Sequence, residues 1–375
     1  MQFRDLKRQY QVLKEDIDKA VMEVASDCNF ISGRQVKELE EELAEYVGVK
    51  HCISCANGTD ALTLAAMALE IGPGDAVFVP DFTFFSTGEI VSFAGAVPVF
   101  VDVDMDTFNI MPEHLEKMIQ KTLEEGRLTP KAVIPVDLFG LTADYERIKK
   151  IADQYELFVI EDGAQGFGGS LGGNRACSFG DISTTSFFPA KPLGCYGDGG
   201  AVFTDDDQLA ALLESFRIHG KGTMKYDNVR IGVNSRLDTI QAAILQVKLR
   251  AFREYELDKV NRAAAKYTEL LKDTVKTPVI PAGYYSSWAQ YTIQLDSREQ
   301  RDSLQAALKE QGIPSMIYYP KPMHRQQAFA DLNCSDAEYG NTIKLCDTVL
   351  SLPMHPYLED SDVEKVAAVL CRCIQ

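Results

Sequence analysis

The chain opens with a pattern of apolar positions that changes period along its length. Over residues 34–47, RQVKELEEELAEYV, apolar residues recur at helical spacing on a charged background, which predicts an amphipathic helix. A second predicted helix covers 143–156. Strands are expected in four short apolar runs rich in β-branched residues, at 74–85, 96–104, 131–140 and 157–165. This alternation predicts an α/β domain with a mainly parallel sheet, helices on both faces, and ligands beyond the carboxyl ends of the strands.

The pattern changes again in the C-terminal third of the chain. Residues 235–273 predict one long helix or two joined helices. A smaller α+β unit follows. It has short apolar segments at 289–295 and 313–319, and predicted helices at 298–312 and 360–373. We therefore expect a large α/β domain over residues 1–250 and a small α+β domain over 251–375. A continuous helical connector between them favours two domains that share an interface over two that move freely relative to each other.

Composition narrows the function classes. The 375 residues are 46% hydrophobic and 25% charged, as in ordinary globular proteins. The formal net charge of -17 disfavours nucleic acid as a partner, although a local cationic pocket can still bind an anionic small molecule. The N-terminus resembles no export signal, and no apolar run approaches a membrane span. Nine scattered cysteines lack zinc-ligand spacing, so we expect reduced thiols, no metal and a cytoplasmic protein.

The segment ANGTDAL, residues 56–62, is the first candidate for chemistry. A turn at Gly58, with Thr59 at the start of a helix, presents backbone N–H groups and a hydroxyl. The helix N-terminus adds partial positive charge, so this arrangement suits a phosphate. Taken alone, it is equally the pattern of a capped helix after a glycine turn, and that ordinary interpretation is the commoner one.

The segment VIEDGAQGFGG, residues 159–169, places Asp162 directly after an apolar strand. Its carboxylate should be buried near the strand end, where it requires a positive or hydrogen-bonding partner. A protonated pyridine nitrogen would serve, and so would a structural arginine or backbone amides. The sequence alone favours neither the cofactor nor the structural partner.

The segment SFFPAKPLGCYGDGG, residues 186–200, holds a lysine among apolar residues and glycines. Partial desolvation of Lys191 would lower its pKa and favour the free amine that Schiff-base chemistry needs. Ser186, five residues earlier, could add a hydroxyl to a phosphate site. The alternative is a lysine whose ammonium group reaches water, but the glycines that follow indicate close backbone packing.

The segment DFTFF, residues 81–85, ends a predicted strand with an aromatic cluster. Phe84 could stack on a flat cofactor ring, or be part of the core. Each of these features is weak alone. Their order along the chain is that of a fold-type I pyridoxal-phosphate (PLP) enzyme: phosphate turn, aromatic residue, acidic strand end, then lysine.

The chain resembles the PLP-dependent sugar aminotransferases of the DegT/DnrJ/StrS family, which act on nucleotide-linked keto-sugars. The resemblance runs over nearly the whole chain, through strings such as CISCANGTDAL, VIEDGAQGFGG, KPLGCYGDGGA, GVNSRLDTIQAAIL and LPMHPYL. The closest subgroup aminates UDP-2-acetamido-2-deoxy-3-oxoglucuronate. The resemblance implies the fold-type I architecture, a PLP cofactor, L-glutamate as amino donor, and a homodimer with shared active sites.

It also implies a role for each matched residue. Lys191 would bind the cofactor aldehyde and move protons, and Asp162 would keep the pyridine nitrogen protonated. Gln165 would contact the phenolic oxygen of the ring and Phe84 would stack on its face. The phosphate would be held by Gly58, Thr59, Ser186 and, from the neighbouring subunit, Asn234.

Two further residues are candidates for substrate binding. Arg236 could pair with an anionic group of the sugar or the amino donor, or form a structural ion pair with Asp238. Tyr318 stands where related members often have histidine, and could bond to the sugar or its phosphates, or pack in the core.

Three rival functions have different sequence requirements. A PLP-dependent sugar dehydratase of the same family typically has histidine at the position of Lys191. A non-enzymatic regulator or sensor of this fold would need a DNA-binding appendage, which is absent from the sequence. A generic amino-acid aminotransferase is disfavoured by the family-specific strings.

Overall fold

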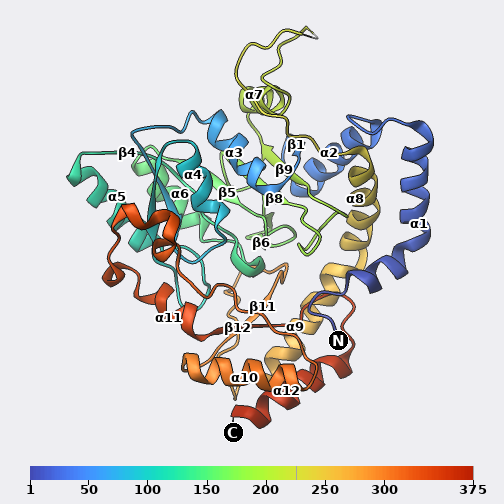
Figure 1. Cartoon of the computed structure of the whole chain (residues 1–375), viewed down its shortest axis with the longest axis vertical. Coiled ribbons are helices and arrows are strands. Elements are labelled where there is room, and N and C mark those ends of the chain that lie inside the picture. The colour runs from blue at the N-terminus through green and yellow to red at the C-terminus, as the bar shows by residue number, and fades with distance from the viewer. Residues whose placement is uncertain (225, 375) are drawn as a thin grey trace.

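The structure, a computed structural model, describes residues 1–224 and 226–374 of the chain. Its centre is a seven-stranded sheet in the order β1-β9-β8-β5-β4-β2-β3 (Figure 1). The strands of this sheet are β1 (His51–Cys55), β2 (Asp75–Pro80), β3 (Val97–Val101), β4 (Thr129–Val133), β5 (Phe158–Asp162), β8 (Ile182–Ser186) and β9 (Gly200–Thr204).

The direction of the strands confirms the expectation of a mainly parallel sheet. Strands β3, β2, β4, β5 and β8 run parallel to one another, whereas β9 is antiparallel to both of its neighbours, β8 and β1. The carboxyl ends of β1, β2, β5 and β8 therefore lie along one edge of the sheet, the edge at which ligands bind in such folds.

Helices cover both faces of the sheet, because successive strand residues point to opposite sides. Val77 and Val79 pack with α3 (Gly58–Ala68), α4 (Ser86–Phe93) and α7 (Asp207–Arg217) on one face. Phe78 packs on the other face, in the layer with α5 and α6. The helices of that second layer are α2 (Arg34–Val47), α5 (Pro112–Glu125), α6 (Tyr145–Gln154) and α8 (Thr239–Ala251).

The predicted long helical region is continuous, but one of its turns is not α-helical. Helix α8 passes through one π-helical turn, Phe252–Glu256, into α9 (Leu257–Leu271), which is the joined pair that the sequence allowed. The N-terminal helix α1 (Leu6–Asp27) packs along α8 at the edge of the molecule (Figure 1). Helix α2 has the bounds that its apolar period predicts.

The C-terminal residues build a second, smaller core. Strands β11 (Tyr291–Gln294) and β12 (Val349–Leu352) pair antiparallel, and α9, α10 (Arg298–Glu310) and α12 (Asp360–Ile374) pack on them. The apolar segment 313–319 forms no strand; only Met316 pairs with Ser351. The remaining elements are α11 (Gly340–Thr348), β6 (Ser170–Leu171), β7 (Asn174–Arg175), β10 (Tyr284–Tyr285) and short 3-10 turns at Leu138–Gly140, Met323–Arg325, Gln327–Leu332 and Asp336–Glu338.

The two cores do not divide cleanly by residue number. Met323, Phe329 and Tyr339 come from the C-terminal third of the chain but pack into the core of the large sheet. The division of the chain into domains at residue 250 stays a prediction.

Candidate active site

The candidate residues gather at the carboxyl edge of the sheet because of strand register. Asp162 is the last residue of β5 and Ser186 the last of β8. Ser186 pairs with Gly200 of β9, which in turn pairs with Cys55 at the end of β1. The turn before α3 therefore lies beside the start of the Lys191 loop, which we define as residues 187–199 between β8 and β9.

Asp162 is a buried carboxylate, 5% exposed. Its Oδ2 accepts a hydrogen bond from Thr87 Oγ1 at 3.0 Å, and its Oδ1 accepts from the backbone N–H of Ala164 at 3.2 Å. Burial raises the pKa of this carboxyl group, whereas the charge of Lys191 and the hydrogen bonds oppose the rise. A second cation at this carboxylate would stabilise its ionised form further.

Lys191 lies close enough to Asp162 for their charges to interact. Burial lowers the pKa of its amine, the carboxylate of Asp162 raises it, and the guanidinium of Arg4 lowers it. The balance of these effects is a lysine whose neutral, nucleophilic form is more accessible than in water.

The backbone around Lys191 is held from outside its own loop. Arg4, ahead of α1, donates from Nη2 to the carbonyl of Lys191 at 2.7 Å and to that of Pro192 at 3.2 Å. The N–H of Lys191 donates to the carbonyl of Phe188 at 2.8 Å, which closes a tight turn. These bonds fix the direction in which the lysine side chain leaves the backbone.

Helix α8 holds the second half of the same loop. Lys248, which is 1% exposed, donates to the carbonyl of Gly194. Gln241 accepts from the N–H of Tyr196 at 2.8 Å and donates to its carbonyl at 3.2 Å. Burial lowers the pKa of Lys248 to about 8, with Glu256 acting in the opposite direction.

The turn before α3 packs directly on the end of β8. A Cβ on Gly58 would lie 2.7 Å from Cβ of Ser186, so only glycine permits this approach. Thr59 Oγ1 and Ser86 Oγ lie 2.8 Å apart, and either can be the donor. Ser86 and Gly58 begin helices α4 and α3, and so two helix N-termini and three hydroxyl groups converge here, an arrangement that suits a phosphate.

Gln165 and Tyr319 form a polar contact at the same edge of the sheet. Gln165 Oε1 accepts from the N–H of Phe139 at 2.9 Å, and Nε2 donates to Tyr319 Oη at 3.1 Å. A carboxamide has two N–H donors, so one remains for a ring oxygen. Phe84 is 55% exposed and is not part of the core; its ring lies 6.5 Å from that of Tyr319.

This set of groups fits PLP in each of its parts. The close approach of Gly58 to Ser186, with hydroxyls and helix N-termini around it, suits the phosphate. The buried Asp162 suits a pyridinium nitrogen, the exposed ring of Phe84 offers a stacking face, and Lys191 supplies an amine with a lowered pKa.

In the part of the chain that the structure describes, three predicted residues, Asn234, Tyr318 and Arg236, form no hydrogen bond with this group. Asn234 is exposed and pairs through its backbone with Ile218; its neighbour Ser235 accepts from the N–H of Ala56 at 3.0 Å. Tyr318 is partly buried and packs against Phe3, with ring centroids 6.2 Å apart. It is the adjacent Tyr319 that bonds to Gln165.

Arg236 lines a separate pocket at the start of α2. It lies there beside Arg217, whose Nη1 donates to Glu40 Oε1 at 2.6 Å. Within residues 1–224 and 226–374, no ion pair joins Arg236 to Asp238, so the structural pairing that the sequence allowed is not formed.

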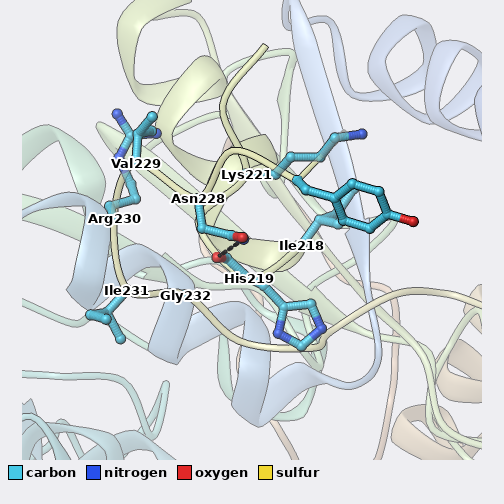
Figure 2. A pocket seen from close by; sticks show the side chains of 9 residues that line it. Ile218, His219, Lys221, Asn228, Val229, Arg230, Ile231 and Gly232 are labelled. Carbon is cyan, nitrogen blue, oxygen red and sulfur yellow. Dashed lines mark hydrogen bonds between the residues drawn. The ribbon is translucent and has the colours of Figure 1, made fainter. Parts of the chain in front are cut away.

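Asn234 and Arg236 follow a segment that projects from the molecule after α7 (Figure 1). Its described residues are 218–224 and 226–232, and we call it the hairpin because Lys221 pairs antiparallel with Asn228. Figure 2 shows a hollow on this hairpin, where Asn228 Nδ2 donates to the carbonyl of His219 at 2.9 Å. At the base of the hairpin Gly220, with φ +68°, lies so near Arg230 that a Cβ would meet its carbonyl oxygen at 1.9 Å. The apolar side chains of Met224, Val229 and Ile231 are 71%, 54% and 89% exposed.

Sequence reasoning missed four contributors to the site. Ser86 and Thr87 begin α4 directly after the aromatic segment that contains Phe84, and serine or threonine at a helix start is a detectable signal. Tyr319 and Arg4 come from opposite ends of the chain and meet the site only through tertiary packing, so no local pattern indicates them.

The fold and the site define a PLP-dependent aminotransferase, and solved structures agree. An aminotransferase from Brucella abortus is 51% identical and superposes with a TM-score of 0.96, over 99% of this chain and 98% of that one. NtdA from Bacillus subtilis, with bound cofactor PMP, is 30% identical with a TM-score of 0.86, over 96% of this chain and 82% of that one.

The chain belongs to the DegT/DnrJ/EryC1/StrS aminotransferase family, whose model matches residues 11–371. A relative from Pseudomonas aeruginosa, a UDP-2-acetamido-2-deoxy-3-oxo-D-glucuronate aminotransferase, is 46% identical over 99% of both chains. Among the described residues, no helix is both long and apolar enough to cross a membrane.

Proposed function

We propose that this protein transfers the amino group of L-glutamate to a UDP-linked 3-oxo uronate sugar in the synthesis of a polysaccharide precursor. The observation that carries the proposal is the 46% identity to the Pseudomonas relative over 99% of both chains, together with the placement of Lys191 near Asp162, the buried carboxylate at the sheet edge. The identity supports the substrate, and the placement of these two residues supports the chemistry.

The proposed roles of the residues follow from their surroundings. Bound PLP supplies an electron sink for the carbanion that forms next to the substrate nitrogen. Asp162 holds the proton on the pyridine nitrogen, because its carboxylate is buried and supported by Thr87. Gly58, Thr59 and Ser186 hold the phosphate at the starts of two helices.

Lys191 acts first as a nucleophile and then as a base. Its Nζ would hold the cofactor aldehyde, and when free it would take the α-proton of the donor. The lowered pKa of Lys191 keeps that nitrogen available for the proton near neutral pH. The same atom returns a proton when the keto-sugar is aminated, so ping-pong kinetics are expected.

We further propose that the active enzyme is a homodimer in which Asn234 reaches the cofactor phosphate of the neighbouring subunit. Its support is that, among the described residues, Asn234 and Arg236 form no hydrogen bond with the Lys191 group of their own chain, and that they follow a projecting hairpin with exposed apolar residues. A second copy that covers this hairpin would explain both observations. Arg236 and Tyr318 remain the proposed contacts to the anionic sugar.

A cytoplasmic location is also proposed. All nine cysteines are free thiols, as a reducing compartment would keep them.

A screen of half-reactions tests the proposed function. The pyridoxamine-loaded enzyme is mixed with matched 3-oxo and 4-oxo nucleotide sugars and with free 2-oxo acids, and the return of the visible absorbance band is followed. We expect the 3-oxo uronate to react fastest and 2-oxoglutarate to react as the product of the donor. Response to free keto acids alone would contradict the sugar assignment, and failure to bind PLP would contradict the whole proposal.

A further inference from the structure

The guanidinium of Arg4 is anchored beside the catalytic lysine by only one of its edges. Nη2 donates to the carbonyls of Lys191 and Pro192 at 2.7 and 3.2 Å. A guanidinium has five N–H donors in a planar fork. In the part of the chain that the structure describes, no acceptor lies within hydrogen-bonding distance of Nε or Nη1, and no carboxylate lies within 4 Å of the group.

Two lysines lie near the guanidinium of Arg4. Lys191 and Lys248 are close enough for the charge of Arg4 to lower the pKa of each. Glu256 is the acidic group that acts on Arg4, but its carboxylate already accepts hydrogen bonds from Gln9 and from Tyr357 Oη. Burial lowers the pKa of Arg4 to about 10, and the charge of Glu256 opposes this shift.

Three basic groups, Arg4, Lys191 and Lys248, thus lie near one another in a chain whose net charge is -17. Arg4 is partly buried, and a guanidinium with free N–H donors and no carboxylate beside it can pair with an anionic ligand. Phe3, the neighbour of Arg4, packs against Tyr318, which is next to the Gln165 partner Tyr319. The N-terminal segment thus contacts the site both at the Lys191 loop and at the tyrosine pair.

We propose that Arg4 is a carboxylate-binding residue of the active site, whose second edge pairs with a carboxylate of the substrate while its first edge holds the Lys191 loop. A planar guanidinium suits a carboxylate because two parallel N–H groups match its two oxygens. Arg4 precedes residues 11–371, the part of the chain that the family model matches. The inference rests on the proposed function, in which two carboxylates enter the site: that of the amino donor and that of the uronate sugar.

The test compares wild type with Arg4→Gln, and with Arg8→Gln as a control at an exposed arginine of the same segment. One arm measures the apparent dissociation constant of L-glutamate in single turnovers. A second arm measures those of two oxo-sugar nucleotides that differ only in a carboxylate or a hydroxymethyl group at C6. If Arg4 binds the carboxylate of glutamate, Arg4→Gln should raise the dissociation constant of glutamate about 10- to 100-fold; if it binds that of the sugar, the dissociation constant of the uronate nucleotide should rise by the same factor. This is the effect of losing one charged hydrogen-bonded pair.

A third arm does not depend on turnover. Succinate, which has no amino or keto group, is titrated into the PLP-loaded proteins by calorimetry, with weaker binding to Arg4→Gln expected. Arg4→Lys, which keeps a charge and a donor for the Lys191 carbonyl but not the planar fork, is measured in parallel and should also bind more weakly. Unchanged carboxylate affinity in every arm, even with a lower melting temperature, would overturn the proposal and leave Arg4 as a structural clamp. A wild type that binds succinate but aminates no sugar would contradict the proposed function and not the role of Arg4.

Discussion

The Lys191 loop, which contains a predicted site residue, and the hairpin, which precedes two others, differ in how they are held. The Lys191 loop is tied at both ends by strand pairing and in its middle by Arg4, Gln241 and Lys248. The hairpin, which leads to Asn234, projects from the molecule and leaves Ile231 89% exposed. The chain therefore completes by itself the part of the site proposed to do the chemistry, and leaves unfinished the part proposed to serve a neighbour.

The largest expected effect comes from removing the side-chain amine of Lys191. Lys191→Ala should abolish the visible absorbance band of the PLP-loaded enzyme and lower kcat/KM by about 10⁴-fold or more, because one atom supplies both nucleophile and base. Absorbance spectra and steady-state rates measure both. Lys221→Ala, in the hairpin, is the matched control and should keep the absorbance band; loss of the band there as well would break the contrast between the loops.

The partner of that lysine should be the next most sensitive position. Asp162→Asn preserves size and the bond from Thr87, but it removes the charge that keeps the pyridine nitrogen protonated. We expect kcat to fall by about 10²–10³-fold, the cost of losing one preorganised electrostatic contact. PLP should still bind, as shown by its absorbance; wild-type turnover in this variant would show that another group holds the nitrogen.

The contact of Lys248 with the Lys191 loop should be visible in the pH dependence of the free energy of unfolding. The pKa of Lys248 is about 8 in the folded protein, against 10.5 for the free side chain. Between these values the unfolded chain binds more protons, so this group makes the free energy of unfolding rise with pH. Lys248→Met should lose that rise, by about 3 kcal/mol from pH 7 to pH 10.5.

Urea unfolding of the cofactor-free proteins at several pH values measures this difference. Exposed Lys7→Met serves as the control and should follow the wild-type curve. If the free energy of unfolding changed with pH in the same way for Lys248→Met and the wild type, Lys248 would contribute no pH dependence. That result would contradict the lowered pKa of Lys248 in the folded protein.

The smallest effect is expected at the hairpin, which should alter assembly rather than folding. Ile231→Asp places a charge in the proposed interface, and we expect the dimer dissociation constant to rise about 30-fold, as at other buried interface positions. Sedimentation velocity measures it, and the melting temperature of the monomer should not change. Leu123→Asp, also exposed but on α5, should remain dimeric. A dimer that survives Ile231→Asp would place the interface elsewhere.

The sequence was sufficient for features that depend on local pattern. The apolar period predicted α2 with its observed bounds, and the β-branched runs located β2, β3, β4 and β5. The reversed direction of β9 was not predictable, because strand pairing depends on contacts far apart in sequence. Residues 313–319 have the apolar character of a strand, yet they pack against the large domain through Ile317, Tyr318 and Tyr319 instead.

The same limit applies to the site. Lys191 and Asp162 stand out in sequence because a charged group beside an apolar run is unusual. Arg4 does not stand out, because the N-terminal segment contains several charged residues and only the fold brings this one to the lysine carbonyl.

The pairing of Ser186 with Gly200 has a thermodynamic consequence for cofactor binding. It closes the Lys191 loop at its base as the sheet forms, and ordering a residue costs about 1–2 kcal/mol in backbone conformational entropy. That cost is met during folding, so it does not reduce the affinity for the cofactor. Proteins with and without PLP should therefore show the same slow amide hydrogen exchange through this loop, and cofactor loading should behave as the docking of two rigid bodies.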